Sequence, residues 1–163
     1  KITLLSLLFA GLLHLQAQEP LSIFQPLVGK TWSAEGNWGD GSKFKQDVTF
    51  KYHLGQTLVI AESDGYVNQK QTQYGPRNHG IRKFDTATNT VKFWEFDVFG
   101  GLTEGTVTAN GEDIIYTYAY GESIVTDYWE YIDDHTYNFM VGSYENGEWK
   151  QKYLSTQFTT PKN

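Results

Sequence analysis

The sequence contains no cysteine, only two arginines and only four prolines. Without cysteine there are no disulfide bonds, thiolate metal sites or cysteine nucleophiles. The net charge of −6 over 163 residues argues against a nucleic-acid-binding protein, because phosphate recognition requires clustered Lys and Arg. No apolar run reaches the roughly 20 residues that a membrane-spanning helix needs. The expected partners therefore include neither nucleic acid nor a membrane crossed by a helix.

Aromatic residues, in contrast, are abundant. They make up 16% of the chain and include 11 Tyr, whereas disordered chains are poor in aromatic residues. A chain of this length forms one domain, and no shift in composition marks a linker. We therefore expect a single folded domain whose core is large enough to be stable without disulfides.

The first 17 residues have the pattern of a targeting segment. Lys1 precedes a mainly apolar run over 2–13, and Ala17 supplies a small residue at its end. A basic start, about a dozen apolar residues and a small residue near the cleavage point are typical of a secretory signal peptide. We predict a signal peptide over 1–17, a mature domain over 18–163, and export to the periplasm or the extracellular space.

Polar and mainly apolar side chains alternate along the mature chain with a period of two, which is typical of strands with one solvent-exposed face. Residues 43–52 place lysines and other polar residues on one face, and the expected inward set is Phe44, Gln46, Val48, Phe50 and Tyr52. In residues 91–98 the expected inward set is Trp94, Phe96 and Val98, opposite Glu95 and Asp97. In residues 149–153 it is Trp149, Gln151 and Tyr153.

Turn signals such as Asn110-Gly111 and Asn146-Gly147 separate the alternating runs at a spacing typical of sandwiches and barrels. An antiparallel meander of many strands removes its exposed edges most simply by closing on itself. The sequence therefore predicts an all-β fold, a single antiparallel up-and-down barrel of about ten strands. The expected strands are 29–37, 43–53, 56–66, 77–85, 90–98, 102–109, 112–119, 123–132, 135–142 and 148–159.

The run Leu27-Val28-Gly29-Lys30-Thr31-Trp32 resembles the Gly-x-Trp opening of calycins, with one extra residue in the spacing. Calycins comprise lipocalins, fatty-acid-binding proteins and nitrobindin-like barrels. Phe84-Asp85 with its Thr-Asn turn, and residues 134–149 with Tyr-x-Phe and Asn-Gly-Glu-Trp, are similar to lipocalin-like secreted bacterial domains. The resemblance implies a calycin-like barrel in which Trp32 packs across the closed end.

The tyrosines on expected inward faces indicate a roomy interior, because a buried Tyr needs a partner for its hydroxyl. Barrels of this size can enclose a ligand cavity. The expected ligand-binding residues are Phe50, Tyr52, Trp94, Phe96, Tyr116, Tyr118 and Tyr153, with Glu62 and Arg82 as polar anchors. Glu62 is ambiguous, since either Leu58, Ile60 and Glu62 or Val59, Ala61 and Ser63 can form the inner face of that strand. Asp127 has the same ambiguity.

Both arginines lie in the stretch Arg77-Asn78-His79-Gly80-Ile81-Arg82. Strict alternation places Arg77 and His79 on one face and Arg82 on the other. A guanidinium group binds carboxylates in a bidentate manner and does not deprotonate. We expect Arg82 to point into the cavity and to select an anionic ligand; the alternative is a basic rim that pairs with surface carboxylates.

The sequence favours an exported protein that binds a small hydrophobic or amphipathic molecule, without a cofactor, metal or catalytic residues. A first alternative is an isomerase- or cyclase-type enzyme that uses an inward carboxylate and a Tyr. A second is nitrobindin-like haem binding, for which His135, after Asp133-Asp134, is the candidate ligand. A third is a glycan-contacting protein that uses surface Trp and Tyr. The histidines at 53, 79 and 135 are too widely spaced in sequence to predict a zinc site.

Overall fold

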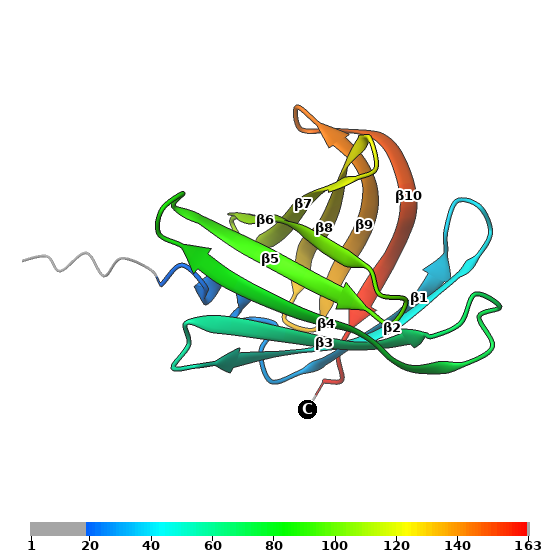
Figure 1. Ribbon diagram of the computed structural model, residues 1–163, viewed down its shortest axis with the longest axis horizontal. Coiled ribbons are helices and arrows are strands. Elements are labelled where there is room, and N and C mark those ends of the chain that lie inside the picture. The colour runs from blue at the N-terminus through cyan, green and yellow to red at the C-terminus, as the bar shows by residue number, and fades with distance from the viewer. Residues whose placement is uncertain (1–18, 163) are drawn as a thin grey trace, which may run out of the picture.

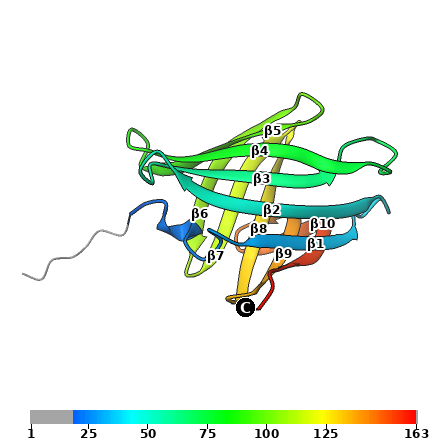
Figure 2. The ribbon, with the colours of Figure 1, turned by 90° about the horizontal axis from the view of Figure 1, so that it is seen from below.

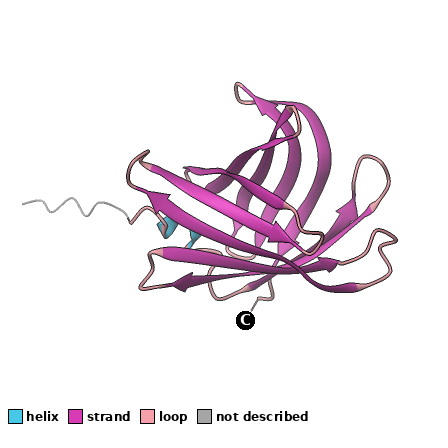
Figure 3. Ribbon diagram, in the orientation of Figure 1, coloured by secondary structure: helices cyan, strands magenta, loops and turns pink. Residues whose placement is uncertain are grey.

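The computed structural model of the protein describes residues 19–162, and the predicted signal peptide over 1–17 lies outside them. The described part consists almost entirely of antiparallel strands, with one short 3-10 helix, η1 (Ser22–Phe24), before the first strand (Figure 3). The strands are β1 (Thr31–Asn37), β2 (Lys43–His53), β3 (Leu58–Tyr66), β4 (Tyr74–Asp85), β5 (Thr90–Asp97), β6 (Leu102–Asn110), β7 (Asp113–Tyr120), β8 (Ser123–Asp133), β9 (Thr136–Glu145) and β10 (Glu148–Thr159).

Each strand pairs with its neighbours in the chain, and β1 pairs with β10 through Ser33 and Thr159 to close the sheet (Figure 1). The fold is thus an up-and-down barrel of ten antiparallel strands, as the sequence predicted. Every expected strand overlaps an observed one. The tight turns at Gly111 and Gly147 have positive φ, which is the backbone conformation that their Asn-Gly pairs predicted.

Alternation in β2 sets the inner face of the barrel there. Val48 and Phe50 are 4% and 2% exposed and belong to the core, while Phe44 packs against it. Lys43 and Lys51 are exposed, so the expected register of this strand is confirmed.

One end of the barrel is closed by the segment that precedes β1. Leu21, Phe24 and Leu27 are buried there, and η1 lies at the end of the barrel in Figure 2. Trp32 is fully buried, donates its Nε1–H to the carbonyl of Leu27 at 3.2 Å, and packs edge-on to Tyr137. This is the packing role that the calycin resemblance implies. Within the described residues no helix is long and apolar enough to cross a bilayer.

The sequence-based assignment of faces is wrong for β5. Val91 and Phe93 are buried, whereas Phe96 and Val98 are about half exposed, so Trp94 and Phe96 lie on the outer face. The strand carries large apolar residues at both parities, and its pairing with β4, which sets Phe93 opposite Arg82, decides which set is buried.

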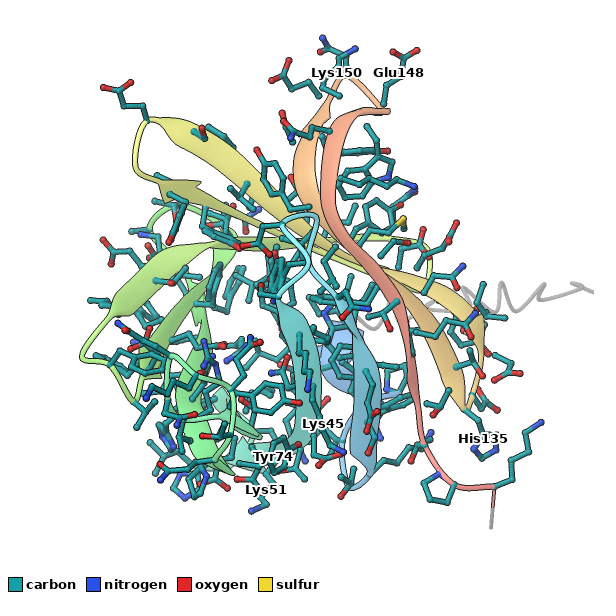
Figure 4. The ribbon with its side chains drawn as sticks, turned by 90° about the vertical axis from the view of Figure 1, so that its right-hand side faces the viewer. Lys45, Lys51, Tyr74, His135, Glu148 and Lys150 are labelled. Atoms are coloured by element: carbon teal, nitrogen blue, oxygen red, sulfur yellow. The ribbon has the colours of Figure 1, made fainter. Side chains whose placement is uncertain are left out.

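The assignment is also wrong for the start of β10, where two β-bulges interrupt the alternation between Trp149 and Leu154. Trp149 packs with Tyr128 and Tyr144 on the outside, and Gln151 is exposed. A bulge inserts one unpaired residue, so the side chains that follow it change face. Glu148 and Lys150 lie at the tip of this hairpin, far from His135 at the other end of the barrel (Figure 4).

Candidate functional site

A cavity of about 300 Å³ occupies the half of the barrel away from η1. Its mouth lies among the β1–β2, β3–β4 and β5–β6 turns, where Trp38, Gln71 and Asp97 contribute to the lining. Its deeper wall is aromatic and comprises Phe50, Phe93, Tyr116, Tyr118, Trp129 and Phe139. Polar and charged residues form much of the remaining lining, and a concave site that combines apolar walls with convergent polar groups is typical of small-molecule binding.

A buried ion pair crosses this wall. Arg82 on β4 is 4% exposed, and its Nη2 donates to Oε2 of Glu95 on β5 at 2.8 Å. Its Nε–H donates to the hydroxyl of Tyr116 on β7 at 3.2 Å. The guanidinium also lies 5.2–5.9 Å from the ring centroids of Phe50, Phe93 and Tyr116. These contacts therefore link three strands, and the aromatic rings shield the guanidinium from water, while Glu95 is partly exposed.

Gly80 makes the room that this ion pair needs. A Cβ at position 80 would overlap Nη1 of Arg82 and lie 2.9 Å from Oε2 of Glu95. Asn78, one pleat along β4, donates its amide to the other Glu95 oxygen at 2.8 Å. Six side-chain polar atoms of the described residues are buried without a hydrogen-bond partner, and three of them belong to residues that line the cavity: Arg82 Nη1, Asn78 Oδ1 and Ser63 Oγ.

A second polar pair lies beside the first. The hydroxyl of Tyr118 donates to Oδ1 of Asp127 on β8 at 2.9 Å, and Asp127 is the register partner of Tyr116. Burial raises the pKa of the Asp127 carboxyl to about 7. The hydrogen bond from Tyr118 and the charge of Arg82 oppose this rise, and the charge of Glu95 adds to it. Burial also raises the pKa of Tyr118, so its hydroxyl stays protonated and remains a donor. No cation within 19–162 forms an ion pair with Asp127.

Arg77 reaches the mouth of the same cavity. The pairing of β3 with β4 shifts register between Ser63 and Asp64, which turns Arg77 inward over Gly65. Arg77 donates to the carbonyl of Tyr66, and it lies 5.1 Å from the ring of Phe99.

The expectation that Arg77 shares a face with His79 is therefore wrong, because strict alternation takes no account of a bulge. The side chain of His79 points outward and is 54% exposed. Both arginines of the protein consequently line one cavity.

Four of the residues predicted to bind a ligand do line the cavity: Phe50, Arg82, Tyr116 and Tyr118. Tyr52 points toward the closed end instead, where its hydroxyl donates to the carbonyl of Leu21 at 3.2 Å. Tyr153 lies in the bulged part of β10 beside Trp38, outside the main cavity.

The other three predicted residues lie on the outside of the barrel. Trp94 and Phe96 point outward because the faces of β5 are reversed, as described above. The side chain of Glu62 is half exposed and accepts a hydrogen bond from Lys51 at 3.0 Å. It is therefore a surface carboxylate, and the alternative inner face of β3, with Val59, Ala61 and Ser63 buried, is the correct one.

Several members of the site were not predicted from the sequence, among them Phe93 and Glu95, and the position of Asp127 was left undecided. The sequence pattern placed Phe93 and Glu95 on the solvent-exposed face of their strand. The apolar residues Val91 and Phe93, two positions apart, indicated that this face could instead point inward. Asp127 was recognised as ambiguous, and the pairing of β8 with β7 places it inside.

The predicted haem ligand His135 lies in the β8–β9 turn at the closed end, away from the cavity (Figure 4). Its backbone N–H donates to Oδ1 of Asp133 at 2.8 Å, which is the capping contact of a turn residue. Over residues 19–162 no three His, Asp or Glu side chains are grouped closely enough to hold a metal ion.

The chain matches no protein-family model and no curated protein. Among solved structures it is similar to a barrel described as the de novo design of a fluorescence-activating beta barrel. The two share 12% identity, with a TM-score of 0.43, over 85% of this chain and 97% of the designed one.

Proposed function

We propose that the protein is an exported binding protein that holds a small, partly apolar molecule in the barrel cavity. The observation that carries this proposal is the set of buried cavity-lining atoms without a partner, on Arg82, Asn78 and Ser63. Buried polar groups are nearly always hydrogen-bonded, so groups left without partners mark a place where a ligand or ordered water completes the network.

The size of the cavity limits the molecule. A volume of about 300 Å³ is at the lower end of the range of small-molecule sites. Aromatic rings such as Phe93 and Trp129 form its wall, which favours a ligand with one or two rings or a short alkyl body.

Export and membership of the lipocalin-like secreted domains are part of the same proposal. They are supported by the signal-peptide pattern over 1–17 and by the Gly29-to-Trp32 opening of a closed barrel. Export is tested by the intact mass of the protein recovered from the cell envelope. If the predicted signal peptide is cleaved, that mass equals the mass of the chain without residues 1–17.

Binding is tested with the uncharged fluorescent probe N-phenyl-1-naphthylamine and by native mass spectrometry of the purified protein. Ala61 is 4% exposed and lines the cavity, so Ala61→Phe fills part of the space. The neighbouring Ile60 points outward, and Ile60→Phe is the matched control. We expect Ala61→Phe to abolish the probe's fluorescence gain and Ile60→Phe to preserve it. Equal binding by both variants would contradict a cavity site.

The sequence also predicted an anionic ligand bound by Arg82. Such binding requires the ligand carboxylate to compete with Glu95, which already occupies Nη2 of Arg82. The test compares the affinities of a short fatty acid and its neutral alcohol, each measured with the wild type and with Arg82→Ala. An anion site would bind the acid more tightly than the alcohol in the wild type and would lose that preference in the variant.

Proton-transfer catalysis is a second candidate, favoured by the contact between Asp127 and Tyr118. A carboxyl with a pKa of about 7 can both accept and donate a proton near neutral pH. An enzyme of this type would exchange the α-hydrogens of a bound ketone with deuterium from the solvent. NMR detects that exchange, and Asp127→Asn would stop it.

A further inference from the structure

The deep part of the cavity contains more carboxylates than cations. Glu95 and Asp127 both line it, and Arg82 is the cation beside them. Glu95 forms an ion pair with Arg82 at 2.8 Å and also accepts a hydrogen bond from the amide of Asn78. Asp127 is the carboxyl without an ion-pair partner, and when it is ionised its one hydrogen-bond donor among the described residues is the neutral hydroxyl of Tyr118.

From this charge distribution we propose that the ligand is an amine, with an ammonium group that binds Asp127 and an aromatic or other apolar body that fills the cavity. The inference rests on the proposed binding function and names the chemical class of its ligand. A buried carboxylate is costly unless a cation pairs with it, and an ammonium supplies both the charge and hydrogen-bond donors.

The wall around Asp127 is suited to a cation. Tyr116 and Tyr118 on β7 and Trp129 on β8 line the same cavity, and Phe93 faces them from β5. Aromatic faces attract ammonium groups through their quadrupoles, with Trp the strongest of them, and this attraction grows when water is excluded. The groups that would hold the apolar body of an amine thus also favour its charge.

The basic residues of the cavity other than Arg82 lie nearer to the solvent. Lys43 and Lys45 belong to the first residues of β2 at the mouth, and Lys45 pairs with Glu35 at 2.5 Å. Arg77 is engaged by the carbonyl of Tyr66. Charges that face water are screened strongly compared with those in the buried interior. They do not neutralise Asp127.

The experiment measures displacement of N-phenyl-1-naphthylamine by three indoles of similar size: tryptamine, tryptophol and indole-3-propionate. At about pH 8, above the pKa of about 7 of Asp127, the three carry a positive charge, no charge and a negative charge. We expect tryptamine to bind best and indole-3-propionate worst, with about tenfold or more between tryptamine and tryptophol, as for one charge-assisted hydrogen bond.

The deciding variant is Asp127→Asn, which keeps the shape of the side chain and its acceptor for Tyr118. Asp113 on the outer face accepts the hydroxyl of Tyr128 at 2.8 Å in the same way, so Asp113→Asn is the matched control for net charge. We expect Asp127→Asn to bring tryptamine to the affinity of tryptophol and to leave tryptophol unchanged, while Asp113→Asn changes neither.

The outcomes separate the two proposals. If the naphthylamine probe binds and indole-3-propionate is preferred, or if Asp127→Asn leaves the order unchanged, the amine inference is overturned and the binding function stands. If the probe fails to bind the wild type, or binds Ala61→Phe equally well, the binding function fails, and the inference that rests on it fails too. Retained probe binding by Asp127→Asn shows that the variant is folded.

Discussion

Replacing Glu95 with Gln removes the counter-charge of Arg82 while almost preserving the shape of the side chain. The side chain of Arg82 is 5% exposed and that of Glu95 is 23% exposed, so the guanidinium would remain charged in a place with little access to water. Removing one partner of a buried ion pair costs about 3–5 kcal/mol, because the other charge is left uncompensated.

Two features of the site place the expected loss in the free energy of unfolding at the lower end of that range, at about 3 kcal/mol. Tyr116 still accepts a hydrogen bond from the Arg82 Nε–H after the replacement. Asp127, whose pKa the charge of Arg82 lowers, still supplies a counter-charge that interacts with the guanidinium. The variant should therefore fold, but with a much smaller free energy of unfolding.

Glu62 provides the matched control. It accepts from Lys51 at 3.0 Å on the outer face, where both side chains are at least half exposed, and exposed pairs contribute about 0–1 kcal/mol. Urea unfolding followed by Trp fluorescence compares Glu95→Gln with Glu62→Gln. If Glu95→Gln lowers the free energy of unfolding no more than Glu62→Gln does, the assignment of a largely buried ion pair is refuted. The double variant Arg82→Met/Glu95→Gln should recover much of the loss, because it removes the uncompensated charge.

Three further predictions concern the core and the polar cluster. Gly80→Ala should destabilise the protein by about 1–3 kcal/mol through overpacking against the buried guanidinium, whereas Gly75→Ala, on the same strand with nothing within 4 Å, should be neutral in urea unfolding. Phe50→Ala should cost about 3–5 kcal/mol and Lys51→Ala less than about 1 kcal/mol by the same measurement. The raised pKa of Asp127 means that the folded state binds a proton more tightly than the unfolded chain between the ordinary value of 3.8 and about 7. The free energy of unfolding should therefore fall as pH rises through that window, by at most about 1.4 kcal/mol per pH unit, and a pH series of urea titrations should show this loss removed in Asp127→Asn.

The sequence predicted the barrel well because the information that defines it is local. Turn signals such as Asn110-Gly111 bound the strands, and β2 alternates so strictly that only one register buries Val48 and Phe50. The closure of β1 on β10 through Ser33 and Thr159 followed from the number of strands and the need to remove the sheet edges.

The cavity was predicted less well because its residues come from strands in which alternation is ambiguous or broken. In β5 either Phe93 or Trp94 satisfies the pattern, and the partner strand decides between them. On β4 the position of Arg77 depends on a bulge, whose place is set by pairing with β3 rather than by the local sequence.

The ambiguity of these strands has a physical origin in the site itself. A strand that faces a polar cavity must place groups such as Glu95 and Asp127 on its inner face, while residues such as Phe96 and Ile124 on its outer face are about half exposed. The usual contrast between an apolar inner face and a polar outer face is therefore weakest where the barrel contains its polar cluster. A carboxylate in such a position is stable only if other strands supply its partners, as β4 does for Glu95 and β7 does for Asp127. Those partners are distant in sequence, so the polar network, rather than the period of any one strand, determines which face is inside.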